Sequence, residues 1–240
     1  AGVAVARSVK LALEGDLVPD AVNVAGGIID PFVRPGIALV EKLGQVIAGL
    51  AGSALTRLDL DVRGELAAYD VKVYQLAALK GYYSRIVSEN VSYVNAPLLA
   101  QQRGVEVSLS TSEDSKDYRN TTTLRAALAD GTTVEVSGTL SGTKMVEKLI
   151  GINGYEIEVP IAAHHIVMLY RDRPGIVALY GTAFGEAGIN IAGMAIARHS
   201  EGGQALSILT VDSPVPDALL EQLRIAIDAD VMREVDVSDV

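Results

Sequence analysis

The residues of this chain best suited to chemistry lie where a predicted strand meets a predicted helix in the last third. Tyr170 and Asp172 end that strand, Pro174-Gly175 opens the helix, and Asn190 begins the next strand. A zwitterionic amino acid needs an acceptor for its ammonium, which Asp172 can supply. Its carboxylate needs donors, which the N–H groups at the positive end of the helix and the Asn190 amide can supply. These residues predict an amino-acid site, and the alternative role for Asp172 is an N-terminal helix cap.

No other set of residues predicts a reaction. The chain has no Gly-x-Gly-x-x-Gly fingerprint, and the run 138–144 is too short for a phosphate loop and lies between predicted strands. His164 and His165 are neighbours on a strand, so they face opposite sides and suit no shared metal ion. We therefore expect no catalytic residues and no metal site.

Composition narrows the class of protein. The 240 residues carry a net charge of −10, include no Cys and no Trp, and are 49% hydrophobic, so an aliphatic core is expected. Absence of Cys excludes disulfides and thiolate chemistry. The acidic balance argues against nucleic acid, and no apolar run reaches the length of a membrane span. These features favour a cytoplasmic protein.

Residues 1–160 predict a hinge followed by an α+β domain. A helix over 3–14 precedes Gly26-Gly27, whose paired glycines suit a hinge as well as an ordinary turn. Asp130-Gly131 and Asn153-Gly154 each predict a hairpin turn. The remaining periodicities indicate mostly antiparallel strands, with helices over 31–51 and 70–88, one opened by Asn95-Ala96-Pro97, and strands over 57–63, 105–110, 121–129, 132–140, 144–151 and 155–159.

The final segment has a simpler order. Strands over 166–170, 189–197, 204–211 and 231–237 alternate with helices over 174–187 and 216–228. This is the β-α-β-β-α-β order of a ferredoxin-like module. The helical periodicity predicts that the following residues face inward: Ile176, Leu179, Tyr180, Ala183, Phe184, Ala187, Leu219, Leu223, Ala226 and Ile227.

Several segments resemble a known family. The runs 171–176, Arg-Asp-Arg-Pro-Gly-Ile, and 188–191, Gly-Ile-Asn-Ile, resemble the ACT domain, a regulatory module that binds amino acids. The runs 7–15 and 18–24 look like the end of the catalytic body of D-3-phosphoglycerate dehydrogenase, and Gly26-Gly27 like its hinge. The runs 63–65, 94–97 and 136–140 resemble the allosteric substrate-binding domain of that family's long form.

The resemblance implies three parts and a function. Residues 1–27 would end the catalytic body, 28–160 form the intervening domain, and 164–240 form the ACT domain. The family oxidises 3-phosphoglycerate with NAD, and L-serine inhibits it at an interface between two ACT domains. The resemblance implies that serine is bound by Tyr170, Asp172, Pro174, Gly175, Ile176 and Asn190. It also implies a candidate anion site at Lys144 and Lys148, although Glu156 nearby would repel a phosphate.

The first hypothesis is therefore a serine-sensing regulatory part of a homo-oligomeric dehydrogenase. The NAD-binding and catalytic residues of the family lie upstream of residue 1, so no cofactor and no activity are expected in this part alone. One alternative is a purely structural oligomerisation module. Another is the regulatory part of an iron–sulfur L-serine dehydratase, which the resemblance of residues 1–24 disfavours.

Overall fold

The computed structural model describes residues 5–6, 8–10, 18 and 29–238. Of the helix predicted over 3–14, residues 5–6 and 8–10 are described, and they are helical. The rest of that helix, the strand-like run 22–24 and the Gly26-Gly27 hinge lie outside the described residues. The chain divides into two compact units, residues 1–148 and 149–240, and the division falls within one strand. The predicted boundary at residues 160–164 stays a prediction.

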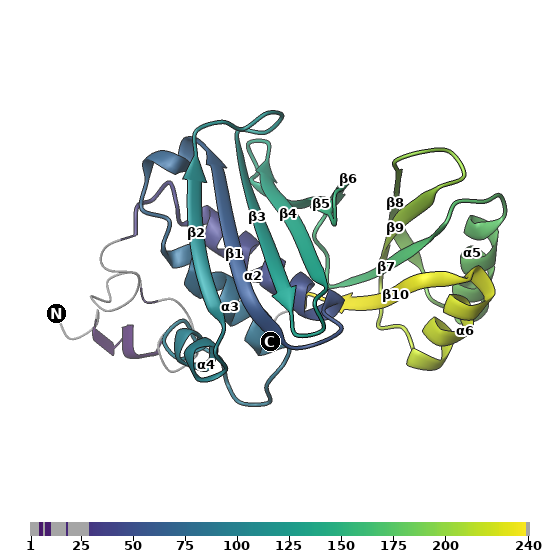
Figure 1. Cartoon of the computed structure of the whole chain (residues 1–240), viewed down its shortest axis with the longest axis horizontal. Helices are drawn as coiled ribbons and strands as arrows, with labels where there is room; N and C mark the ends of the chain where they lie inside the picture. The colour runs from purple at the N-terminus through teal and green to yellow at the C-terminus, as the bar shows by residue number, and fades with distance from the viewer. Residues whose placement is uncertain (1–4, 7, 11–17, 19–28, 239–240) are drawn as a thin grey trace. The chain divides into compact units, whose positions relative to one another are not determined.

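The first unit contains the helices and most strands predicted for it (Figure 1). Helix α2 begins at Pro35, where proline suits the first turn, and Pro97 likewise lies in the first turn of α4. The elements are α2 (Pro35–Leu50), β1 (Leu55–Gly64), the 3-10 helix η1 (Glu65–Ala68), α3 (Val73–Ser84), α4 (Ala96–Gln102), β2 (Glu106–Ser112), β3 (Asn120–Leu128), β4 (Thr133–Ser141) and β5 (Val146–Ile152), followed in the second unit by β6 (Tyr155–Pro160).

Within the first unit, the larger sheet has the strand order β2-β1-β3-β4. Strand β1 pairs in parallel with β2, and the chain between them forms α3 and α4; β1–β3 and β3–β4 are antiparallel. Both predicted tight turns are present, because Gly131, Asn153 and Gly154 adopt the positive φ that such hairpins need. The mostly antiparallel α+β prediction is confirmed.

Helices α2 and α3 cross with their backbones in contact. A Cβ on Gly81 would lie 1.8 Å from the carbonyl oxygen of Glu41, and one on Gly44 would lie 2.2 Å from that of Ala78. Two glycines, one on each helix, therefore allow this close approach. Helix α2 also packs on the sheet, because its Leu43 side chain lies directly against Gly138 of β4.

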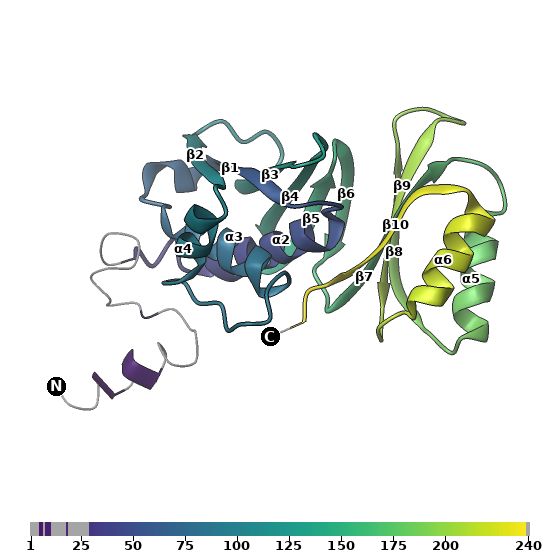
Figure 2. The ribbon, with the colours of Figure 1, turned by 60° about the horizontal axis from the view of Figure 1, so that its bottom comes forward.

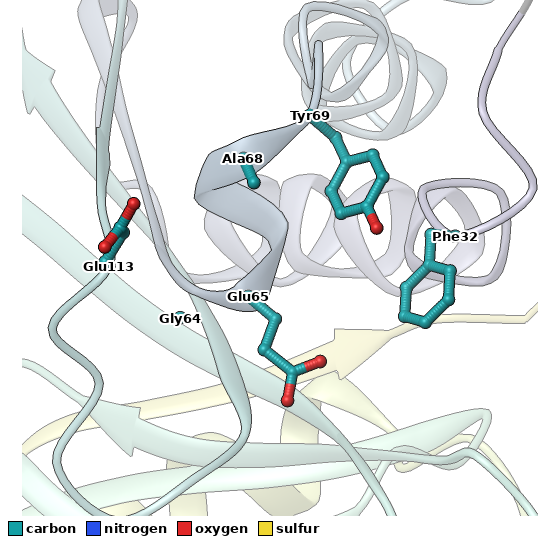
Figure 3. Close-up of a pocket in the computed structure, with 6 residues that line it drawn as sticks. All are labelled: Phe32, Gly64, Glu65, Ala68, Tyr69 and Glu113. Carbon is teal, nitrogen blue, oxygen red and sulfur yellow. The ribbon is translucent and has the colours of Figure 1, made fainter.

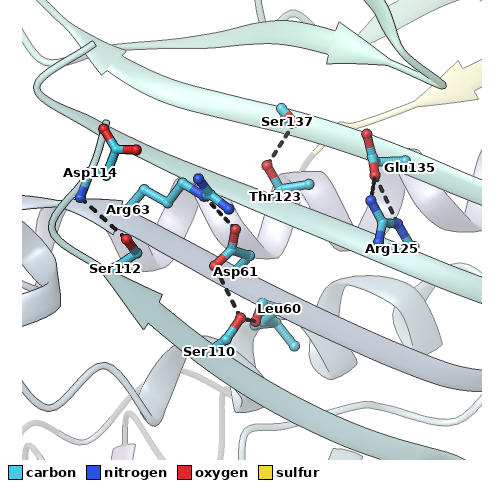
Figure 4. A network of polar contacts seen from close by, with 10 residues as sticks. All are labelled: Leu60, Asp61, Arg63, Ser110, Ser112, Asp114, Thr123, Arg125, Glu135 and Ser137. Carbon is cyan, nitrogen blue, oxygen red and sulfur yellow. Dashed lines mark hydrogen bonds and ion pairs between the residues drawn. The ribbon is translucent and has the colours of Figure 1, made fainter. Parts of the chain in front are cut away.

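The opposite face of this sheet carries polar side chains that bond to one another both within a strand and across strands (Figure 4). Arg63 Nε donates to Asp61 Oδ2 at 2.6 Å, and Ser110 Oγ donates to Asp61 Oδ1 at 3.0 Å. Arg125 pairs with Glu135 on the neighbouring strand. Leu58, Leu60 and Val62 of β1 are buried on the helix side, which confirms the alternation predicted from the sequence.

The second unit contains a four-stranded antiparallel sheet of order β10-β7-β9-β8. Helices α5 and α6 both cover one face of it (Figure 2). The ferredoxin-like prediction is confirmed, with β7 (His164–Arg171), α5 (Ile176–Glu186), β8 (Ile191–Arg198), β9 (Gln204–Val211), α6 (Asp217–Ile227) and β10 (Ala229–Asp236).

Three of the residues predicted to face inward are exposed instead: Leu179, Ala187 and Ala226. Helix α5 buries only a narrow stripe, Ile176, Tyr180 and Phe184, at intervals of four residues. The helix face beside this stripe is apolar but exposed to solvent. Exposed Met194 and Ile196 lie on β8, at the edge of the sheet.

Candidate functional site

Tyr170 lies on β7 and faces the helices. Its side chain is 2% exposed, and its hydroxyl lies 2.7 Å from Ser207 Oγ on β9. Burial raises the pKa of Tyr170, the Ser207 hydrogen bond opposes this rise, and the nearby Asp172 carboxylate adds to it. The hydroxyl is therefore a neutral group held in the wall of the predicted site.

Asp172 follows β7 at the same end of the sheet. Its backbone N–H donates to Gly203 O at 2.8 Å, and its carboxylate accepts a hydrogen bond from Arg198 Nη1 at 2.6 Å. Helix α5 has no side-chain cap, so the alternative role of Asp172 as a helix cap is wrong. The Asp172 side chain is 23% exposed and the Arg198 side chain 53%, so this ion pair faces solvent.

The N-terminus of α5 is open beside this pair. Gly175 is its N-cap residue, with φ +94°, and a Cβ placed there would meet no atom within 4 Å. Pro174 is exposed, whereas Ile176 is buried in the core. The space beside Gly175 at this end of the helix is therefore open, and the free N–H groups of a helix N-terminus attract an anion.

Asn190 lies at the other end of the sheet. Its Nδ2 donates to Asp212 Oδ2 at 2.7 Å. The register pairs Ile191 with Val211 at one end of β8 and Arg198 with Ala205 at the other. At about 3.3 Å per residue, β8 separates these ends by roughly 20 Å. Within one chain, Asn190 and Asp172 therefore cannot contact the same amino acid, so both can contact one ligand only if they belong to different copies of the chain.

Arg198 is a site residue that the sequence did not reveal. An arginine near the end of a predicted strand resembles any solvated charge. Only the strand order β7-β9-β8 shows that Arg198 reaches across β9 to Asp172. The hydrogen bond and charge of Asp172 raise the pKa of Arg198 further above its ordinary value.

The candidate anion-site residues lie around the β4–β5 turn. Lys144 is exposed in the turn, and Lys148 is half-buried on β5. The residue between Val146 and Lys148, Glu147, pairs with Lys42 of α2 at 2.5 Å. Glu156 is exposed on β6. The anion site at these positions stays a prediction.

A pocket of about 390 Å³ opens in the first unit beside the Arg63-Gly64-Glu65 run (Figure 3). Phe32 stacks on Tyr69 with ring centroids 5.5 Å apart, and Glu65 pairs with Arg119 at 2.6 Å. The Arg119 guanidinium also lies over the Phe32 ring. Gly64, Ala68 and Glu113 complete the lining. Phe32, Tyr69 and Glu65 of the lining thus each already have a partner.

The two neighbouring histidines are separated as predicted. His164 lies 3.3 Å from Glu234, while His165 is fully buried and accepts a hydrogen bond from the Ala162 N–H at 3.0 Å. Within the described part of the chain, no group of three or more His, Asp or Glu side chains is arranged to hold a metal ion.

Likewise, none of the described helices is both long and apolar enough to cross a membrane.

Two protein-family models match the chain. The "D-3-phosphoglycerate dehydrogenase intervening domain" matches residues 32–153, and the ACT domain matches residues 164–228. Fold and matches together define a chain built of two regulatory-type modules. The chain belongs to the D-3-phosphoglycerate dehydrogenase family.

Curated relatives agree with the family models. A D-3-phosphoglycerate dehydrogenase of Mycobacterium leprae is 39% identical over 238 residues, and one of Mycobacterium tuberculosis (strain H37Rv) is 41% identical over 239 residues. Each match covers 99% of this chain but 45% of the relative. One of Synechocystis sp. is 32% identical over 224 residues, covering 92% of this chain and 40% of the relative. The chain thus spans less than half the length of these relatives.

Proposed function

We propose that this chain is the regulatory part of a cytoplasmic D-3-phosphoglycerate dehydrogenase, and that it binds L-serine between the ACT domains of two copies for feedback inhibition. The NAD-dependent catalytic part would lie in the remainder of a longer protein. The observation that carries the proposal is that Asp172, which pairs with Arg198 at the end of β8, and Asn190, just before the start of β8, lie at opposite ends of the sheet. Each chain then offers two complementary half-sites rather than one whole site.

Pairing along β8 would join these half-sites. Strand β8 ends its sheet, and it carries Met194 and Ile196 exposed beside α5. Strand β6 packs on the other face, where Tyr155 stacks on His199 at 4.4 Å, so β6 leaves the helix side of this edge uncovered. In a two-fold antiparallel pair of β8 strands, the start of one strand lies beside the end of the other. Asn190 of a second copy would then approach Asp172.

Ligand binding tests the sensor. We expect calorimetry on the full chain to detect L-serine at up to millimolar concentration, and Asp172→Ala to weaken this binding at least about tenfold, since a charge-assisted hydrogen bond contributes about 1.5–3 kcal/mol. Asp217→Ala, an exposed acid at the start of α6, is the control and should bind as the wild type does. Absence of serine heat in the wild-type chain would refute the sensor.

Oligomeric state tests the pairing. Ile196 is 44% exposed in one chain, so Ile196→Asp should leave each copy folded. A charge buried at an apolar interface is costly, so the variant should shift the chain to smaller species in sedimentation and weaken serine binding. Ile225→Asp, at a 65% exposed site on α6, is the matched control. An unchanged oligomer in Ile196→Asp would place the interface elsewhere.

The two alternatives make different predictions. A purely structural module would assemble but give no serine heat with any variant. The match of residues 32–153 to the intervening domain of the dehydrogenase favours that family over an iron–sulfur L-serine dehydratase.

A further inference from the structure

The ion pair between Arg198 and Asp172 occupies the mouth of the proposed effector site. Tyr170, Ala205 and Arg198 lie in one row across β7, β9 and β8, on the face covered by the helices. Asp172 follows Tyr170 on the same side, and Arg198 Nη1 reaches it at 2.6 Å. An amino acid whose ammonium binds Asp172 would therefore compete with the Arg198 guanidinium, which already occupies Oδ2 of that carboxylate.

We propose, resting on the serine-binding function above, that Arg198 exchanges Asp172 for the ligand carboxylate and so selects α-amino acids over amines. When the ammonium takes the Asp172 carboxylate, the guanidinium is released beside the N-terminus of α5. The ligand carboxylate, bonded one carbon away from the ammonium, then faces two positive groups. One ion pair becomes two, and no charge is left unmatched.

The relative strengths of the old and the new ion pair decide whether Arg198 assists the ligand or only competes with it for Asp172. An exposed ion pair such as Arg198–Asp172 contributes about 0–1 kcal/mol, so breaking it hinders the ligand little. A guanidinium binds a carboxylate with well-matched, often bidentate hydrogen bonds, which are stronger when the site is closed from water. The gain from the new pair exceeds the loss of the old one, so removing Arg198 should weaken binding rather than strengthen it.

The location of Arg198 supports the same role. It lies at the end of β8, the edge strand. In the antiparallel pair proposed above, this end lies beside the start of the second copy's β8, where Asn190 is found. Arg198 would thus stand between Asp172 of its own chain and Asn190 of the other, at the junction of the half-sites.

Calorimetry on the full chain with L-serine and with L-serine methyl ester tests the exchange, because the ester keeps the ammonium but lacks the carboxylate charge. We expect Arg198→Ala to weaken serine binding at least tenfold and to leave the ester unchanged. Arg198→Lys should restore part of the serine affinity. Arg171→Ala removes the same charge from an exposed neighbour on the other face of the sheet and should change neither.

The outcomes separate the two claims. If wild type gives no heat with serine, the proposed function fails and this inference falls with it. If the wild type binds serine but Arg198→Ala binds it equally or more tightly, only the exchange is refuted. Equal losses for serine and ester would also refute it, since they would indicate a general disturbance. Thermal unfolding followed by circular dichroism verifies that each variant is folded.

Discussion

Replacing Gly81 by alanine should destabilise the first unit by about 3 kcal/mol, the upper part of the range for overpacking. The new Cβ would lie 1.8 Å from the Glu41 carbonyl oxygen. That atom belongs to the backbone of α2, so no side-chain rotation relieves the clash and the helices must separate. Separation would also disturb Glu41, whose carboxylate pairs with Lys80 at 2.8 Å and accepts from the Tyr93 hydroxyl at 2.5 Å.

Hydrogen exchange resolved by peptide on the full chain measures this loss unit by unit. Protection should fall in α2 and α3 and stay unchanged over β7–β10. Gly181→Ala is the matched control, because a Cβ on Gly181 meets no atom within 4 Å. In an open helical position alanine is about 1 kcal/mol better than glycine, so the control should gain stability. Wild-type protection in Gly81→Ala would show that the helices do not cross this closely.

The sequence predicted elements well where a local cause determines them. Asp130-Gly131 and Asn153-Gly154 require positive φ within two residues, so their turns follow from residue type. The close helix crossing did not follow, because Gly44 and Gly81 resemble helix-weakening residues until two helices are brought together. Leu179 was wrongly placed inward for a related reason: periodicity shows which face is apolar, not how much of it a neighbour covers.

In the candidate site, too, residue types could be interpreted from the sequence, whereas the contacts between distant elements could not. The residue types at Tyr170, Asp172 and Asn190 suggested a ligand with two opposite charges. Whether these residues meet depends on strand order, and the register of β8 on β9 places Asn190 far from Asp172. The same register brings Arg198 to Asp172. The pairing of strands distant in sequence thus decides both that Asn190 is separated from Asp172 and that Arg198 joins the site.

A second large effect is expected on acidification, through His165. This side chain is fully buried, and burial lowers its pKa to about 4, with a hydrogen bond to the Leu209 backbone opposing and the neighbouring His164 adding to the shift. Its Nε2 accepts from the Ala162 N–H at 3.0 Å. A backbone N–H can only donate, so this nitrogen carries no proton. The charged imidazolium would lose that bond as well as its hydration.

The direction of this pH effect on stability follows from the number of protons that the folded and unfolded chains bind. An unfolded histidine has a pKa of about 6.5, above the folded value, so between these values the unfolded chain binds more protons. The contribution of neutral His165 is complete above about pH 6.5 and is lost as the pH falls to about 4. At about 1.4 kcal/mol per pKa unit, the loss is about 3 kcal/mol.

Urea unfolding of the full chain between pH 7 and pH 4 measures this loss against His165→Gln, whose amide can still accept from Ala162 but does not titrate. The variant should be less stable than the wild type at pH 7 and lose about 3 kcal/mol less on acidification, since carboxylates and the His164–Glu234 pair are common to both proteins. His199→Gln changes an exposed histidine and should keep the wild-type dependence. Equal acid losses in His165→Gln and wild type would mean that His165 is hydrated or charged in the fold, and that its Nε2 does not accept a hydrogen bond from the Ala162 N–H.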